Sequence, residues 1–152
     1  MAFSNINLSG IDSPYGKVIE VAIAEIVGAQ PLDQFSGRCT FEGRPACVVR
    51  APYCSESVGI PRHFIKAKLL LIIAWEMGWY CYNVFKIDWI RVLEYENSLT
   101  ERCPDGVEIS YTELSKMAGF IQNVSADFCS SREALERWAK LTGQQIADFT
   151  KG

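Results

Sequence analysis

Apolar residues recur at helical spacing between Ile19 and Val27, which places them on one stripe of a helix. Asp12-Ser13-Pro14 precedes this stripe and is a typical helix start, and Gly28 follows it. The pattern therefore predicts a helix over about residues 14 to 27.

The next patterned stretch, residues 38 to 50, contains strand-forming residues on both sides of a turn at Gly43. It predicts a β-hairpin. Because proline has no N–H to donate to a ladder, Pro45 is expected to place one of the two strands at a sheet edge.

The most apolar run of the chain extends from Leu69 to Trp75. It is apolar on every face, which favours a helix enclosed by other elements. With Ile60-Pro61 as its start and Gly78 as its end, we expect a buried central helix through Met77. The longer stretch from Leu69 to Phe85 carries Glu76 near its centre, and this carboxylate argues against a membrane span.

Alternating polar and apolar positions from Trp79 to Glu96 predict two strands or one long bent strand. Pro104-Asp105-Gly106 is a turn sequence, and residues 107 to 110 are expected to form a short strand that pairs back.

The last third of the chain is predicted to be helical. Ser110 with Glu113, and Ser130 with Glu133, have the spacing of capping boxes. These boxes predict helices over 111 to 123 and 131 to 141, with a further helical turn over 144 to 150.

This order of elements predicts an α+β fold: a mostly antiparallel sheet of about five strands, a buried central helix and a C-terminal helical pair. The chain has 152 residues, of which 49% are hydrophobic. That length and composition suit a single globular domain over residues 1 to 152.

The net charge and the N-terminal residues indicate which class of partner and which cellular compartment to expect. The chain has 15 basic and 18 acidic side chains, so its formal charge of −3 favours a protein partner or self-association over nucleic acid. Met1 to Leu8 lack the pattern of a secretory signal. We therefore expect a soluble cytoplasmic protein with reduced cysteines and no membrane contact.

The candidate metal ligands are Cys39, Cys47, Cys54 and His63. They are eight, seven and nine positions apart, whereas zinc knuckles pair ligands two to four apart. We expect no metal and no cofactor, and we expect several of the cysteines to be buried thiols. Spacing along the sequence leaves open whether the fold brings these four side chains together.

Two further groups bear on catalysis. Cys54 is the cysteine nearest in sequence to His63, and a thiolate nucleophile would need such a base. Glu76 is either exposed at the end of the predicted central helix or buried with a partner such as Arg91. Neither defines a reaction, so we expect no catalytic residues.

Six aromatic residues fall within Trp75 to Trp89. Alternation places Tyr80 and Tyr82 on the strand face opposite Phe85 and Trp89, so some of these rings are expected to be exposed unless helices cover both faces of the sheet. Aromatic residues and arginine dominate protein interfaces. The predicted partner-binding residues are Trp79, Tyr80, Tyr82 and Arg91. The leading hypothesis is a non-catalytic intracellular protein-binding module, such as an inhibitor, an immunity-type protein or an adaptor.

Residues 112 to 128 suggest an alternative. Ser115, Gly119 and Val124 are arranged in a way that resembles the helix-turn-helix of small transcriptional regulators. The resemblance implies a DNA-binding regulator with a recognition helix in the major groove. A third hypothesis is an enzyme built on scattered cysteine or glutamate residues.

Overall fold

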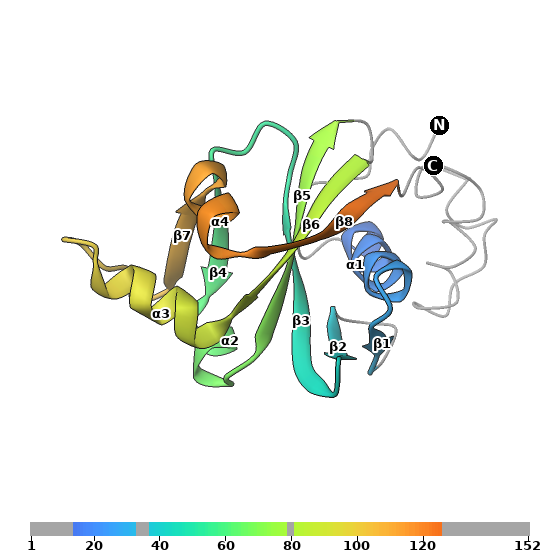
Figure 1. Cartoon of the computed structure of the whole chain (residues 1–152), viewed down its shortest axis with the longest axis horizontal. Helices are drawn as coiled ribbons and strands as arrows, with labels where there is room; N and C mark the ends of the chain where they lie inside the picture. Colours follow the sequence, from blue (N-terminus) through green and yellow to red (C-terminus); the bar gives the residue numbers. More distant parts are fainter. Residues whose placement is uncertain (1–13, 33–36, 79–80, 126–152) are drawn as a thin grey trace.

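The computed structural model describes residues 14–32, 37–78 and 81–125 (Figure 1). Within these ranges, one sheet has six strands, in the order β1 (Gln30–Pro31), β2 (Arg38–Phe41), β3 (Arg44–Ala51), β5 (Leu70–Gly78), β6 (Cys81–Asp88) and β8 (Gly119–Ser125). A second sheet pairs β4 (Ser57–Pro61) with β7 (Gly106–Ser110). The described helices are α1 (Pro14–Ile26), α2 (Arg62–Lys66), α3 (Trp89–Asn97) and α4 (Tyr111–Met117).

Among the described residues, all strand pairs are antiparallel except β3 with β5. The predicted α+β class with a mostly antiparallel sheet is therefore confirmed. The expected number of about five strands is too low, since the larger sheet alone has six. No helix within the described ranges is both long and apolar enough to cross a membrane.

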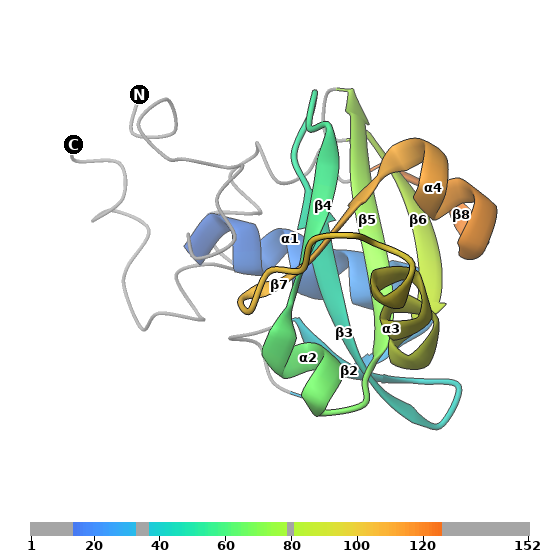
Figure 2. The ribbon, with the colours of Figure 1, turned by 90° about the vertical axis from the view of Figure 1, so that its left-hand side faces the viewer.

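The six-stranded sheet separates two hydrophobic cores. Figure 1 shows α1 on one side of the sheet, and the β4–β7 pair with α2, α3 and α4 on the other. Successive residues of β5 alternate between them: Ile72 packs into the core with α1, and Ile73 into the core with the smaller sheet. Figure 2 shows the smaller sheet and its three helices in front of the larger sheet.

The predicted central helix is wrong, because Leu69 to Trp75 form most of the central strand β5. α2 covers only Arg62–Lys66, and the chain leaves it through Lys68, whose φ of 58° is left-handed. β5 lies between β3 and β6 and is covered on both faces. A strand buried on both faces needs no alternation, so its sequence is apolar throughout like that of a buried helix.

Two N-terminal predictions are confirmed. α1 begins at Pro14 and ends at Ile26, and β2 and β3 form the expected hairpin around Glu42 and Gly43, both with positive φ. The prediction that Pro45 marks an edge strand is wrong, because β3 lies inside the sheet. β5 pairs with β3 only from Ala46 onward, so Pro45 removes no hydrogen bond from that ladder.

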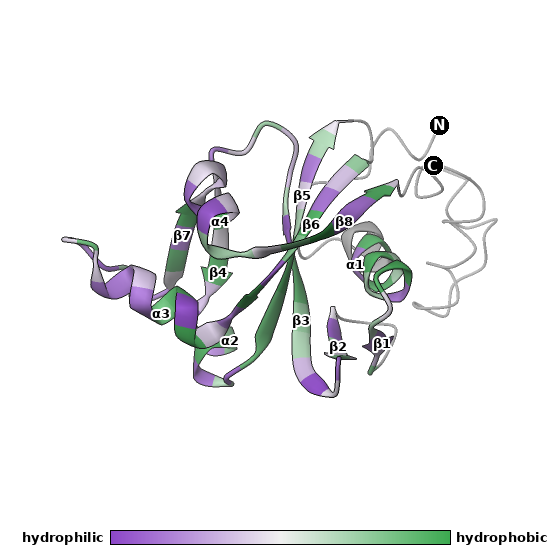
Figure 3. Ribbon diagram, in the orientation of Figure 1, coloured by the Kyte–Doolittle hydropathy of each residue, from purple (hydrophilic) through white to green (hydrophobic). Residues whose placement is uncertain are grey.

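The predicted strand from Trp79 to Glu96 is only partly correct. β6 ends at Asp88, and the alternating residues beyond it form α3, which buries Val92 and Glu96 one turn apart. The short strand after Gly106 is confirmed as β7, but it pairs with β4. Figure 3 shows β7 as largely hydrophobic and the outer part of α3 as largely hydrophilic.

The helix predicted over 111 to 123 is also half correct. α4 begins where Ser110 caps it, its Oγ accepting from the Glu113 N–H at 3.3 Å, but it ends at Met117. Gly119–Ser125 instead pair with β6 as β8. The helix predicted over 131 to 141 and the turn over 144 to 150 lie outside the described residues.

Candidate functional site

Of the four predicted partner-binding residues, the structure describes Tyr82 and Arg91. Tyr82 is on the face opposite Phe85, as alternation predicted, but α1 covers that face and Tyr82 is 0% exposed. Tyr82 therefore presents no exposed ring to a partner in this structure, and its predicted partner contact stays a prediction. Arg91 is exposed on α3 and contacts Glu94 at 3.4 Å. Trp79 and Tyr80 lie outside the described residues.

The predicted helix-turn-helix is wrong, because its second half forms a strand. After α4 ends, Gly119 begins β8, and Val124 packs into the core beneath α1. An extended strand cannot supply a recognition helix. Residues 126 to 128, the end of the proposed motif, lie outside the described ranges.

The four candidate metal ligands are dispersed. Cys39 lies in the core beneath α1, and Cys47 in the core on the other face of the sheet. Burial raises the pKa of Cys39 to about 11 and that of Cys47 to about 12, so both stay protonated at neutral pH. Cys54 and His63 are exposed at opposite ends of β4. Within the described ranges, no three His, Cys, Asp or Glu side chains come together as a metal site.

Glu76 is neither at a helix end nor paired with Arg91. It lies near the end of β5, where its Oε1 accepts from the backbone N–H of Tyr53 at 3.1 Å. Glu76 is only partly buried. This contact gives the carboxylate a structural function at the loop before β4.

A cavity of about 650 Å³ lies beside the smaller sheet. It is lined by Gly59–Pro61 of β4, by Gly106–Glu108 of β7, by Glu96 of α3, and by Leu99, Glu101, Arg102, Cys103 and Asp105 of the segment between α3 and β7. We call it the α3–β7 cavity. It is the candidate site considered below for the described part of the chain.

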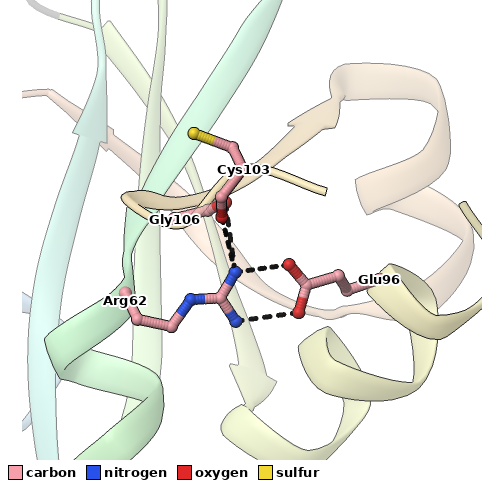
Figure 4. A network of polar contacts seen from close by, with 4 residues as sticks. All are labelled: Arg62, Glu96, Cys103 and Gly106. Atoms are coloured by element: carbon pink, nitrogen blue, oxygen red, sulfur yellow. Dashed lines mark hydrogen bonds and ion pairs between the residues drawn. The ribbon is translucent and has the colours of Figure 1, made fainter. Parts of the chain in front are cut away.

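An ion pair holds one wall of this cavity in place (Figure 4). Arg62 donates from Nη1 to Glu96 Oε1 at 2.8 Å and from Nη2 to Glu96 Oε2, a bidentate arrangement. The same Nη2 also donates to the carbonyl oxygens of Cys103, at 2.8 Å, and Gly106, at 3.5 Å. The contacts fix the segment between α3 and β7 against the start of α2.

The electrostatics follow from this geometry. The hydrogen bond from Arg62 holds the pKa of Glu96 below its ordinary value, against the opposing effect of burial, and Arg102 contributes in the same direction. The pKa of Arg62 is raised by the same hydrogen bond. Both groups are charged at neutral pH, and the charge of Glu96 is matched by Arg62.

Two glycines shape the floor of the cavity. A Cβ on Gly106 would lie 2.3 Å from the carbonyl oxygen of Ile60, so the close approach of β7 to β4 requires glycine there. A Cβ on Gly59 would meet nothing within 4 Å, and Gly59 pairs with Glu108. The floor beside Glu108 is therefore open because residue 59 has no side chain.

The rim is acidic. Glu101, Asp105 and Glu108 are exposed, and none of them has a salt bridge to any residue in the described ranges. Arg102 is the basic residue of the lining. Cys103 is exposed there, but His63 is not part of the lining, so the cavity lacks the thiol and imidazole pair that nucleophilic catalysis needs.

Sequence patterns gave only one sign of this site, the turn Pro104-Asp105-Gly106. Arg62 and Glu96 are 34 positions apart and were assigned to a long helix and a strand. Local spacing could not have revealed the buried Glu96, because residues four apart, such as Val92 and Glu96, share one face of a strand as well as of a helix.

A second exposed feature lies at the β8 edge of the sheet. Phe120 is 59% exposed and packs edge-on against Phe85, with ring centroids 5.5 Å apart. Phe85 in turn contacts Tyr111. This aromatic group was missed because residue 120 was assigned to a helix.

Comparison of the chain with protein-family models, with curated proteins and with solved structures gave no match, so the functional argument depends on the geometry of the site alone.

Proposed function

We propose that the protein is a binding module for another protein, and that the α3–β7 cavity is its contact site. The observation that carries this proposal is a cavity of about 650 Å³ whose wall is held by the Arg62–Glu96 pair and whose floor is left open at Gly59. A pre-formed hollow of this kind suits an anchor side chain from a partner, because binding then costs little rearrangement.

The lining combines apolar surface with charged residues at its edge. More of the lining surface is apolar than polar, and Leu99 is its exposed large hydrophobic side chain. The exposed charged residues are Glu101, Arg102, Asp105 and Glu108. Such a polar rim around a hollow is typical of protein interfaces. Inhibitor, immunity-type and adaptor roles all fall within this proposal.

Capture of a partner by the full chain, with two matched variants, tests the proposal. Gly59→Leu extends a side chain into the cavity from a position where an added Cβ meets nothing within 4 Å, so folding should be kept. Gly119→Leu adds the same group at the β8 edge, beside Phe120. Thermal unfolding of both variants checks that they are folded.

We expect a tagged wild-type chain and Gly119→Leu to retain the same protein from native lysate, and Gly59→Leu to lose it. Equal retention by Gly59→Leu would contradict the proposal. If Gly119→Leu alone lost the retained protein, the interface would be the aromatic group around Phe120.

A further inference from the structure

We infer that the protein associates with a second copy of itself by pairing β8 with β8 at the edge of the six-stranded sheet. This surface is separate from the α3–β7 cavity, because no residue of β8 lines the cavity. The inference therefore does not depend on the proposed function. It is carried by the accessible backbone of β8, by the lack of charge on the strand and by the amide side chains that it presents.

β8 offers a backbone edge to which another strand can pair. It is the last strand in the order of the larger sheet, and among the described residues it pairs with β6 alone. Four of its seven residues are exposed: Gly119, Phe120, Asn123 and Ser125. The outer side of an edge strand presents a row of N–H and C=O groups to other chains. The exposed Phe120 ring lies at the start of this edge and would lose water contact in a paired strand.

Most of the usual protections of an edge strand are missing from β8. Proteins protect edges with charged side chains, prolines, bulges or very short strands. The opposite edge of the sheet, β1, has two residues and contains Pro31. β8 has seven residues, with neither a charged residue nor a proline among them. Its one protection is a bulge at Ile121, which confines regular pairing to residues 122 to 125. The paired stretch is therefore short, and the association should depend on concentration.

The side chains of this stretch favour a second copy over a charged strand. Gln122, Asn123 and Ser125 each have both donor and acceptor groups. Asn123 already donates to Asn83 and accepts from Cys81, but its amide has a second N–H and a second lone pair. A two-fold axis that pairs two identical strands brings such groups of one copy beside those of the other, so donors meet acceptors. A charged strand would lose hydration there without meeting an opposite charge on β8.

Sedimentation velocity of the full chain over a hundredfold range of concentration tests the inference. Asn123→Lys and Asn123→Glu each place a charge in the middle of the paired stretch, at an exposed position. Two copies of either variant repel at the contact, whereas one copy of each attracts. Asn97→Lys and Asn97→Glu make the same changes of net charge at an exposed residue of α3. Circular dichroism checks that all four variants are folded.

We expect wild type to pass from monomer to dimer as its concentration rises. Asn123→Lys and Asn123→Glu should each dimerise at least about tenfold more weakly, and an equimolar mixture of the two should dimerise as well as wild type or better. Both Asn97 variants should behave like wild type.

Three results would overturn the inference. A wild-type chain that stays monomeric at every concentration would show that β8 does not pair with a second copy, and would leave a strand of another protein as the occupant of this edge. Dimerisation of both Asn123 variants at the wild-type level would place the contact elsewhere. Failure of the mixture to recover the dimer would show that the two copies of residue 123 do not face each other.

Discussion

Arg62, the first residue of α2, and Glu96, in the last turn of α3, form a bidentate ion pair across 34 positions of sequence. Their side chains are 22% and 4% exposed. Because Arg62 also donates to two carbonyls near the start of β7, a single guanidinium joins three separate segments. The shape of the α3–β7 cavity therefore depends on this pair.

Replacing Arg62 should destabilise the protein far more than replacing an exposed arginine. Arg62→Met leaves the Glu96 carboxylate buried without its partner, and we expect a loss of about 3 kcal/mol in the free energy of unfolding. Arg91→Met removes an exposed i,i+3 contact and should cost less than about 0.5 kcal/mol. Urea unfolding at pH 7 measures both. Equal losses would show that the Arg62 pair contributes no more than a surface contact.

The same pair predicts how stability depends on pH. Since Arg62 lowers the pKa of Glu96 below its model-compound value of 4.5, the unfolded chain binds this proton at a higher pH than the folded chain does. The contribution of Glu96 is therefore present above about pH 5 and is lost as the pH falls through the lowered pKa. Urea unfolding between pH 7 and pH 3 should show a smaller acid-induced loss for Glu96→Gln than for wild type. Parallel pH profiles for the two chains would refute this assignment.

Tyr82→Ala should unfold or strongly destabilise the protein. Tyr82 is 0% exposed beneath α1, and removing a buried aromatic side chain costs about 3 to 5 kcal/mol. Tyr53→Ala is the matched control, because Tyr53 is 60% exposed and its removal should cost about 0.5 kcal/mol or less. Thermal unfolding measured by circular dichroism compares them. A folded Tyr82→Ala variant with wild-type stability would show that the Tyr82 side chain does not belong to the core beneath α1.

Local patterns predicted α1 and the hairpin of β2 and β3. The helical spacing of Ile19, Ile23 and Val27 matches the α1 residues that lie in the core beneath it, and the hairpin is specified by the turn at Glu42 and Gly43. β5 could not be predicted in the same way, because an apolar run fits a buried helix and a doubly covered strand equally well. Residues 70 to 78 form a strand because they pair with β3 and β6, and that pairing is a property of the whole fold.

Less of the candidate site than of the fold could be predicted from the sequence. The Arg62–Glu96 pair joins residues that only tertiary structure brings together, and the role of Gly106 depends on its distance from the Ile60 carbonyl. The aromatic cluster was visible in the sequence, but the exposure of Tyr82 was not, since α1 covers a face that alternation alone leaves open.

Thiol labelling should separate the cysteines into two classes. Cys39 and Cys47 are buried with raised pKa values of about 11 and about 12, so little thiolate forms at pH 8 and reagents have no access. Cys54 and Cys103 are exposed and should react with iodoacetamide in the folded protein. Peptide mass spectrometry after brief labelling, with and without urea, assigns each site. Rapid labelling of Cys39 or Cys47 in the native protein would contradict the placement of these side chains.

Gly106 and Gly59 offer a sharp comparison, because they lie on paired strands and differ in the space that an added Cβ would have. Alanine at 106 would bring its Cβ within 2.3 Å of the Ile60 carbonyl oxygen, so the strands must separate, and the Arg62 contact with the Gly106 carbonyl would shift with them. We expect Gly106→Ala to cost about 1 to 3 kcal/mol in the free energy of unfolding. Gly59→Ala adds the same methyl group where nothing lies within 4 Å, at a residue without positive φ, and should be neutral or stabilising by about 0.5 kcal/mol. Urea unfolding of the two variants gives this difference directly. Equal stabilities would mean that β4 and β7 separate without cost, and that the α3–β7 cavity is not held in the shape described above.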